Sequence, residues 1–262
     1  MIPGQEPGPG LGVPPRSQTR PEADSMPCLL HYITDRKAFL GDESARRSLV
    51  LEKIAEAARC GVDFVQLREK DLPSRELEQL AAEALAVIRE NAQTTGGPPV
   101  RPTRLLINSR TDVALAITAD GVHLRSDDVS PLDVQLMWKS AGADPRELEQ
   151  GSAGPSPTPI IGVSCHTPDE VARAAAAGAD YALFAPVFEK KDAYGARPAG
   201  LARLQAACRS ASIPVFALGG VALENARSCL EAGAAGIAAI RLFQENPIAE
   251  IVRQLRSQPS HS

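Results

Sequence analysis

A short connection from a helix to a strand recurs four times in this sequence. In each case a helical pattern ends at small residues, and an apolar segment follows at once. The four connections are Cys60–Asp63, Ala119–Val122, Ala177–Asp180 and Ala232–Ala235. Repeated use of one helix-to-strand connection is typical of an architecture in which helices and strands alternate around a common core. The recurrence therefore predicts an α/β fold.

Apolar segments with the length and composition of buried strands alternate with helical patterns along the chain. The predicted strands are 29–33, 62–67, 104–107, 121–124, 160–163, 181–184, 214–218 and 236–240. The predicted helices are 44–60, 74–88, 111–117, 130–140, 168–177, 201–208, 223–230 and 247–255. Such alternation over ~230 residues predicts a (β/α)8 TIM barrel. A doubly wound open sheet is the alternative, but Thr34-Asp35-Arg36, which follows the first strand, is not a glycine fingerprint.

The sequence divides into an amino-terminal extension and one predicted barrel domain. Residues 1–27 are rich in Pro and Gly and show no periodicity, so we expect a disordered extension. A single barrel domain is expected over residues 28–258, because a chain of 262 residues is ample for one large core. Within it, the segment from Ala141 to Pro159 is rich in Gly, Ser and Pro, which indicates a surface insertion.

Composition excludes several classes of protein. The formal net charge of −4 argues against a general nucleic-acid binder, which needs a basic face. No apolar run approaches the ~18 residues of a membrane span, and no secretory signal opens the chain. The five cysteines are scattered without CxxC spacing, which fits reduced thiols better than a disulfide framework or a zinc site. We therefore expect a cytoplasmic protein with no membrane or nucleic-acid partner.

The strand that ends at Leu67 carries polar residues at its carboxyl end. Alternation along the strand places Gln66, Arg68 and Lys70 on one side. Two cations and an amide at the mouth of a strand form an anion site for a phosphate or pyrophosphate. A solvated basic loop held by Glu69 and Asp71 explains this segment equally well when it is considered alone.

Polar residues also follow most of the other predicted strands, at the end of a barrel where active sites are built. They are Asn108, Arg110, His123, Asp128, Ser164, His166, Lys190, Lys191, Gly219 and Gly220. Asp127 and Asp128 have the hard oxygens that Mg²⁺ prefers, although both also suit the cap of the helix that follows. His166 is a candidate proton shuttle or a structural loop residue. The Gly219-Gly220 pair allows backbone N–H groups to approach a phosphate, or forms an ordinary tight turn.

Five motifs, in this order and spacing, resemble those of the thiamine phosphate synthase family, which also includes thiazole tautomerases. The motifs are Gln66–Lys70, Ile107–Arg110, Ala119–Leu124, Gly162–His166 and Ala217–Val221, and the resemblance extends from about Leu29 to Phe243. The resemblance implies a (β/α)8 barrel that joins hydroxymethylpyrimidine pyrophosphate to a thiazole phosphate carboxylate. In that reaction pyrophosphate leaves first, and the thiazole nitrogen traps the resulting pyrimidine cation.

The resemblance also implies roles for individual residues. Pyrophosphate and pyrimidine contacts are implied for Gln66, Arg68, Lys70 and Asn108, and further substrate contacts for Ser164, Gly219 and Gly220. Asp128 corresponds to a Mg²⁺ ligand, while His166 and Lys190 are the candidate catalytic residues. The partners implied are small pyrimidine and thiazole phosphates, and a homo-oligomer is left open.

The sequence departs from the synthase pattern at four places. Ser109 replaces a second Mg²⁺-binding Asp, and Arg125-Ser126 replaces Gly-Gln. The loop at Phe188–Lys191 is shortened and lacks its hydroxyl donors, and Arg241 replaces a phosphate-contacting Ser. These departures leave a thiazole tautomerase, or a barrel that only binds these phosphates, as alternatives. A synthase is the preferred prediction because the pyrophosphate residues are intact.

Overall fold

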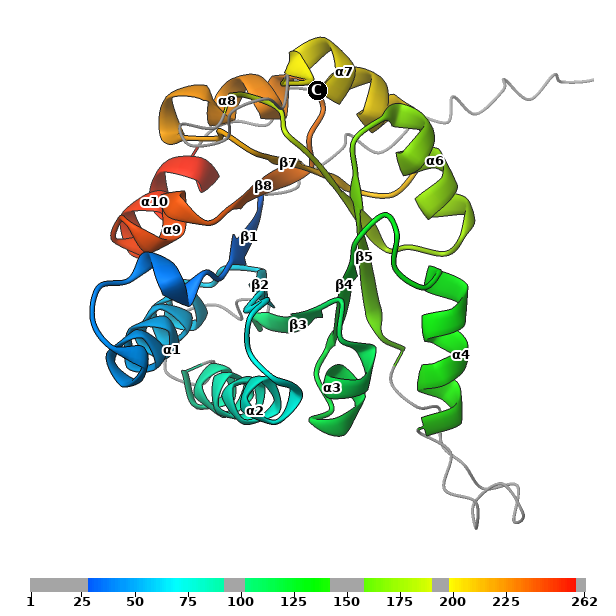
Figure 1. The fold of residues 1–262 in the computed structure, drawn as a ribbon. Helices are drawn as coiled ribbons and strands as arrows, with labels where there is room; N and C mark the ends of the chain where they lie inside the picture. Colours follow the sequence, from blue (N-terminus) through cyan, green and yellow to red (C-terminus); the bar gives the residue numbers. More distant parts are fainter. Residues whose placement is uncertain (1–27, 92–101, 142–157, 190–197, 258–262) are drawn as a thin grey trace, which may run out of the picture.

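The computed structural model describes residues 28–91, 102–141, 158–189 and 198–257, and these form a closed barrel of eight parallel strands (Figure 1). The strands are β1 (Leu29–Ile33), β2 (Phe64–Leu67), β3 (Arg104–Asn108), β4 (Gly121–Leu124), β5 (Ile160–Cys165), β6 (Tyr181–Phe184), β7 (Val215–Leu218) and β8 (Gly236–Ala239). Each strand pairs with the next in the chain, and β8 closes on β1. The predicted TIM barrel is confirmed. The predicted extension 1–27 and most of the predicted insertion lie outside the described residues.

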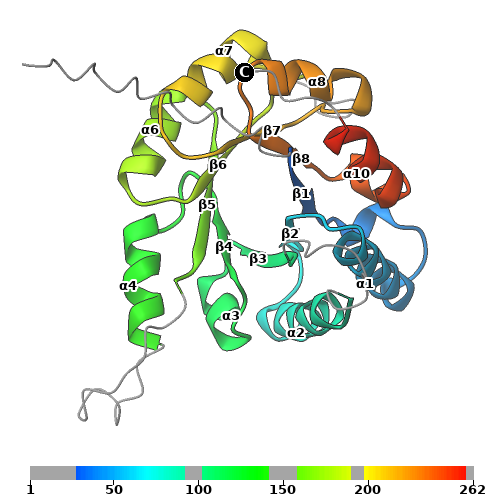
Figure 2. The same cartoon turned by 180° about the vertical axis from the view of Figure 1, so that it is seen from behind.

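Helices form a ring around the barrel, as both views of the fold show (Figures 1 and 2). They are η1 (Arg36–Ala38), α1 (Glu43–Arg59), α2 (Ser74–Asn91), α3 (Thr111–Ala116), α4 (Pro131–Ala141), α6 (Pro168–Ala176), α7 (Gly200–Arg209), α8 (Leu223–Glu231), α9 (Arg241–Gln244) and α10 (Ile248–Arg256). The eight predicted helices are confirmed to within a few residues at their ends. The short helices η1 and α9 were not predicted, because three or four residues are too few to show a helical period.

Several predicted strand boundaries differ from the structure by one or two residues. The second strand was expected from Val62, but β2 begins at Phe64 because Val62 and Asp63 belong to the turn: the Val62 N–H still donates to the carbonyl of Ala57 in α1. The next helix begins at Ser74, as predicted, and the Ser74 hydroxyl accepts a hydrogen bond from Arg110 at 2.9 Å.

The four recurring helix-to-strand connections share one backbone device. Gly61, Gly178 and Gly233 adopt positive φ angles of 74°, 87° and 97°, the left-handed conformation that ends a helix at low steric cost. At the fourth connection the same turn is made by Thr118, whose φ is 51°. The chain therefore reverses direction in the same way at all four places.

An aspartate at three of these connections anchors the neighbouring strand. The side chains of Asp63, Asp120 and Asp180 each accept a hydrogen bond of 2.8 Å from a backbone N–H near the start of an adjacent strand. Because a buried N–H without a partner is costly, these bonds stabilise the amino-terminal end of the barrel. The amino-terminal end of the barrel thus contributes to stability, and the active site of a TIM barrel lies at the opposite, carboxyl-terminal end.

The barrel interior is filled by side chains in layers, so it is a packed core rather than a pore. His31, Phe64, Tyr181 and Phe216 form one aromatic layer, with ring centroids of Tyr181 and its three neighbours 5.4 to 5.7 Å apart. The outward side chains of the strands pack against the helices, as the buried stripe of α2 illustrates. Alternation along each strand thus separates the interior from the outer core.

Candidate active site

A row of hydrogen-bonded polar side chains crosses the carboxyl ends of β2 and β3. The Gln66 amide donates to Asn108 Oδ1 at 2.7 Å, and the Asn108 amide donates to Ser109 Oγ at 3.1 Å. Ser109 adopts a positive φ of 59°, and its N–H donates to the carbonyl of His123 at 2.9 Å. A non-glycine residue in this conformation is held there by its surroundings. The backbone therefore directs the Ser109 hydroxyl toward the row.

Asp128 extends this row from the loop after β4. Burial raises the pKa of Asp128, but hydrogen bonds from Ser109 and Arg125 outweigh burial and hold the pKa below its ordinary value. The backbone N–H of Arg125 donates to one carboxylate oxygen at 2.7 Å, and its guanidinium donates to the other at 3.1 and 3.2 Å. Neither Asp127 nor Asp128 caps α4, because Ser130 fills that role through its hydroxyl. The carboxylate of Asp128 is therefore ionised and oriented.

Arg68 and Lys70 flank Glu69 on the loop after β2. Glu69 is buried and points away from them, where it contacts Thr34 and Arg36. Thr34 Oγ1 donates to Glu69 at 2.6 Å and accepts from the N–H of Arg68 at 3.0 Å. Because Glu69 and the Arg68 backbone share one partner, the loop that carries both cations is fixed from the Thr34 side. The segment Thr34–Arg36 thus has a structural role that the alternation of side chains along β2 does not reveal.

Arg36 is the centre of that anchor. Its side chain is 3% exposed, and it donates to Glu69 at 3.2 Å and to both oxygens of Asp71 at 2.8 Å. It also pairs with Glu43 at the start of α1. A hydrogen bond from Arg36 lowers the pKa of Asp71, against a smaller opposing effect of burial. Sequence reasoning missed this cluster, although an arginine beside the first strand and two acids after the second are visible in the sequence.

A second polar group lies in the barrel wall beside the row. His123 in β4 contacts Tyr181 in β6 through Nδ1 at 3.0 Å, and Ser164 in β5 through Nε2 at 2.8 Å. Burial lowers the pKa of His123 well below its ordinary value, with further lowering by His31 and Arg68. The imidazole of His123 is therefore neutral. Tyr181 was not among the predicted site residues, because an aromatic residue that opens a strand is usually a core residue.

His166 stands directly after β5 and is exposed. Its Nδ1 lies 2.7 Å from the carbonyl oxygen of Ala185, so Nδ1 carries the proton. In the neutral ring Nε2 then holds the lone pair, as a general base requires. Lys190, the other predicted catalytic residue, and Lys191 lie outside the described residues.

The Gly219-Gly220 pair follows β7 and precedes α8. Both residues have positive φ angles, 92° and 67°, and a Cβ on Gly220 would lie 2.5 Å from the carbonyl oxygen of Glu189. The N–H of Phe188 donates to the carbonyl of Gly219 at 3.0 Å, so this turn packs against the loop after β6. Only glycine fits this close approach of two backbones, and the turn leads into the amino terminus of a helix.

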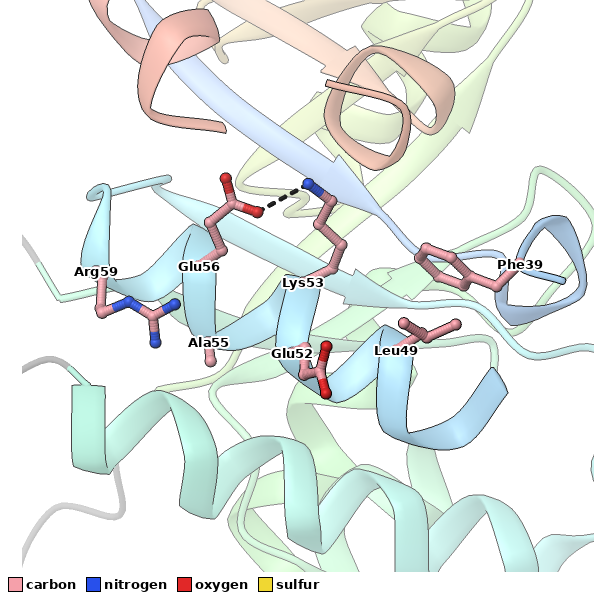
Figure 3. A pocket seen from close by; sticks show the side chains of 7 residues that line it. All are labelled: Phe39, Leu49, Glu52, Lys53, Ala55, Glu56 and Arg59. Carbon is pink, nitrogen blue, oxygen red and sulfur yellow. Dashed lines mark hydrogen bonds and ion pairs between the residues drawn. The ribbon is translucent and has the colours of Figure 1, made fainter. Parts of the chain in front are cut away.

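A hollow of about 420 Å³ lies on the outer side of α1, away from the strand ends. Figure 3 shows Phe39 and Leu49 at one end of it and Arg59 at the other. Two of its charged side chains already have protein partners, since Lys53 donates to Glu56 at 2.7 Å and to the carbonyl of Asn246 at 2.8 Å. The polar row described above, and not this hollow, is the candidate active site.

The donors in the row suit a hard cation only in part. In the part of the chain that the structure describes, no group of three or more His, Cys, Asp or Glu side chains is placed to hold a metal ion. Asp128 offers one carboxylate, and Ser109 and Asn108 offer neutral oxygens beside it. Mg²⁺ is usually held by one or two carboxylates together with phosphate oxygens of the substrate. The residues therefore fit Mg²⁺ only when a phosphorylated ligand supplies further oxygens.

A closed parallel barrel with polar side chains gathered at the carboxyl ends of its strands has the architecture of a TIM barrel, in which active sites are built at that end. The family described as thiamine monophosphate synthase matches residues 30–243. The chain belongs to this family, and its thiamine-phosphate synthase homologues support a transferase. No helix in the described ranges is long and apolar enough to span a membrane.

Individual relatives agree with this assignment. The chain is 40% identical over 220 residues to a putative thiamine-phosphate synthase of Geobacter sulfurreducens, covering 83% of this chain and 87% of that protein. It is 35% identical over 216 residues to a putative thiamine-phosphate synthase 2 of Aquifex aeolicus, covering 82% and 97%. A solved thiamine phosphate pyrophosphorylase from Pyrococcus furiosus superposes with a TM-score of 0.65 at 29% identity, covering 87% of this chain and 94% of that one. None of these relatives is named as a tautomerase.

Proposed function

We propose that this protein is a thiamine-phosphate synthase that joins hydroxymethylpyrimidine pyrophosphate to thiazole phosphate carboxylate and releases pyrophosphate. The observation that carries the proposal is the hydrogen-bonded row from Gln66 through Asn108 and Ser109 to Asp128, with Arg68 and Lys70 on the neighbouring loop. Departure of pyrophosphate develops negative charge, and fixed cations and donors stabilise such charge. This set of residues supplies both the cations and the hydrogen-bond donors that would stabilise the charge of the leaving pyrophosphate.

Each group has a proposed role in that reaction. Arg68 and Lys70 bind the leaving pyrophosphate, and Gln66 and Asn108 orient the pyrimidine by hydrogen bonds. Backbone N–H groups at Gly219-Gly220 bind the phosphate of the thiazole, supported by the start of α8. His166 and Lys190 are the proposed acid/base residues, and Ser164 is a further substrate contact.

Asp128, with Ser109 beside it, would hold Mg²⁺ together with pyrophosphate oxygens. When bound, the ion supplies positive charge at the leaving group. The rest of the charge compensation comes from the chain itself, through Arg68, Lys70 and Arg125. We place the reaction in the cytoplasm, where free thiols such as the five cysteines of this chain stay reduced. A homo-oligomer is compatible with this proposal, and light scattering after size exclusion measures the assembly.

The test is direct incubation with both substrates and Mg²⁺, with thiamine phosphate measured by fluorescence after oxidation. Formation of thiamine phosphate that depends on both substrates, and that falls strongly in Arg68→Ala, supports the proposal. The opposite result is an absence of thiamine phosphate together with isomerisation of the thiazole carboxylate that is lost in His166→Ala. That outcome assigns a tautomerase. Binding of either phosphate without any turnover assigns a barrel that only binds.

A further inference from the structure

Three residues lie in register across neighbouring strands next to the proposed site. His123 in β4 pairs with Gly162 in β5, and Gly162 pairs with Tyr181 in β6. A Cβ on Gly162 would lie 1.9 Å from Cζ of Tyr181 and 2.2 Å from its hydroxyl oxygen. The glycine therefore leaves the space in which the Tyr181 ring crosses β5 and reaches His123. Ser164, two residues after Gly162 on the same face of β5, lies at the other ring nitrogen of His123.

Protonation states in this group follow from burial. His123 is 2% exposed, and burial lowers its pKa well below the ordinary value, so the ring is neutral. Burial also raises the pKa of Tyr181 well above its ordinary value, so the phenol keeps its proton. A neutral imidazole has one N–H donor and one acceptor nitrogen. Two arrangements are therefore possible, which differ in the nitrogen of His123 that carries the proton.

The two arrangements differ in what they do to Tyr181. If Nδ1 carries the proton, it donates to Tyr181, and the buried phenol O–H is left without an acceptor. Within the described residues the Tyr181 hydroxyl has His123 Nδ1 as its hydrogen-bond partner and no other. If Nε2 carries the proton, Tyr181 donates to Nδ1 and Nε2 donates to Ser164 Oγ, so every buried donor is satisfied. A buried donor without a partner is costly, which favours the second arrangement.

We propose that Tyr181 is a positioning residue that fixes His123 as the Nε2–H tautomer and thereby makes Ser164 a hydrogen-bond donor toward the bound ligand. In this arrangement the Ser164 oxygen accepts from His123, so the hydroxyl proton is left for another acceptor, and the side chain, near the carboxyl end of β5, is partly exposed. The ligand atom at Ser164 is therefore an acceptor, such as a pyrophosphate oxygen or a ring nitrogen, and not an amino group. Only the identity of this ligand rests on the proposed function.

The tautomer is measurable by nitrogen NMR without any substrate. The chain has four histidines, and the signals of His123 are those lost in His123→Gln. We expect a protonated Nε2 and an unprotonated Nδ1 for His123 at neutral pH. In Tyr181→Phe the Nδ1–H form should become populated. Tyr32→Phe is the matched control, because the Tyr32 hydroxyl is buried and has no hydrogen-bond partner within the described residues.

Three results would overturn the inference: an Nδ1–H tautomer in the parent, a charged His123 ring in the parent, or a tautomer that is unchanged in Tyr181→Phe. The first two are measured on the parent, so they decide the matter even if a variant fails to fold.

Steady-state kinetics test whether the tautomer affects the reaction. We expect Tyr181→Phe to lower kcat/KM by about two- to tenfold, the effect of one net hydrogen bond, while Tyr32→Phe keeps the parent value.

Ser164 gives the last arm of the test. Ser164→Ala should lower kcat/KM by more than Tyr181→Phe, because it removes the donor itself. Ser164→Thr, which keeps a hydroxyl, should recover part of the loss, whereas equal rates in Ser164→Ala and the parent would contradict a donor role. Failure of the synthase assignment is a separate result, in which the parent forms no thiamine phosphate. The NMR measurement of the His123 tautomer tests the inference independently of that result.

Discussion

Replacing the buried Arg36 by methionine should destabilise the protein far more than loss of a surface ion pair does. Met has a similar length but no charge, so Arg36→Met leaves the Glu69 carboxylate buried without its cation. The Glu69 side chain is 2% exposed. Removal of one partner of a buried pair typically costs about 3–5 kcal/mol. Glu69 keeps the Thr34 hydroxyl and the backbone N–H of residue 36 as donors, so we expect a loss near about 3 kcal/mol.

Arg47→Met provides the matched control. Arg47 also makes two hydrogen bonds to one carboxylate, that of Glu83, at 2.9 and 3.1 Å, but the Arg47 side chain is 28% exposed and that of Glu83 50%. Exposed pairs contribute below about 1 kcal/mol, so the control should lose little. The assay is the free energy of unfolding from denaturant titration of the parent and the two variants. A loss in Arg36→Met no larger than that in Arg47→Met would refute the reasoning.

A double variant identifies the source of the penalty. If the cost comes from an uncompensated Glu69 carboxylate, then Glu69→Gln should be much less harmful in Arg36→Met than in the parent. Additive losses would mean that packing, and not charge, dominates.

The dependence of the unfolding free energy on pH should also change at acidic pH. A hydrogen bond from Arg36 lowers the pKa of Asp71, so its contribution is complete above pH ~4 and lost as pH falls. Arg36→Met should flatten this dependence.

Three further predictions concern the proposed active site and the amino-terminal segment. Arg68→Ala should weaken pyrophosphate binding by at least about tenfold, the effect of one charge-assisted hydrogen bond, while the unfolding free energy stays within about 0.5 kcal/mol of the parent; calorimetry and denaturant titration check the two values. Ser109→Asp should lower the Mg²⁺ concentration needed for half-maximal rate, because a second carboxylate joins Asp128; a parent already saturated at low Mg²⁺ would contradict it. Removal of residues 1–27 should leave turnover unchanged in the same assay, because composition alone predicts that they add no packed core.

The fold was predictable because the barrel repeats one local unit. Strand patterns and glycine-bearing connections such as Ala177–Asp180 are local signals, and the eight strand patterns together determine the architecture. The carboxyl-end position of Gln66 and Asn108 followed from the same logic, since strand ends in a parallel barrel meet at one rim. The contact between their side chains then follows from the pairing of β2 with β3.

What the sequence did not reveal depends on pairs that are distant along the chain. Arg36 and Glu69 lie 33 residues apart, and His123 and Tyr181 lie 58 apart. Neither pair has a local pattern, because a charged loop residue and an aromatic strand residue are common in any barrel. Gly162 is the one local clue to the second pair. It interrupts an otherwise branched apolar strand, and a glycine there indicates close approach of another group.

The pairing of Arg125 with Asp128 bears on how the proposed site balances charge. The synthase pattern that this sequence resembles has an Asp at position 109 in addition to the acid at position 128. In this chain Ser109 removes one negative charge, and Arg125 places a positive one within 3.1 Å of the remaining carboxylate. The site is thus less negative before any ion binds, so part of the charge that attracts pyrophosphate is built into the chain. A cation at Asp128 would compete with the Arg125 guanidinium for Oδ1 of the carboxylate, and this competition weakens cation binding. Under the proposed function, the lower negative charge of the site and the weaker binding of the cation have the same consequence. Arginine would neutralise more of the charge of the leaving pyrophosphate, and Mg²⁺ would neutralise less of it.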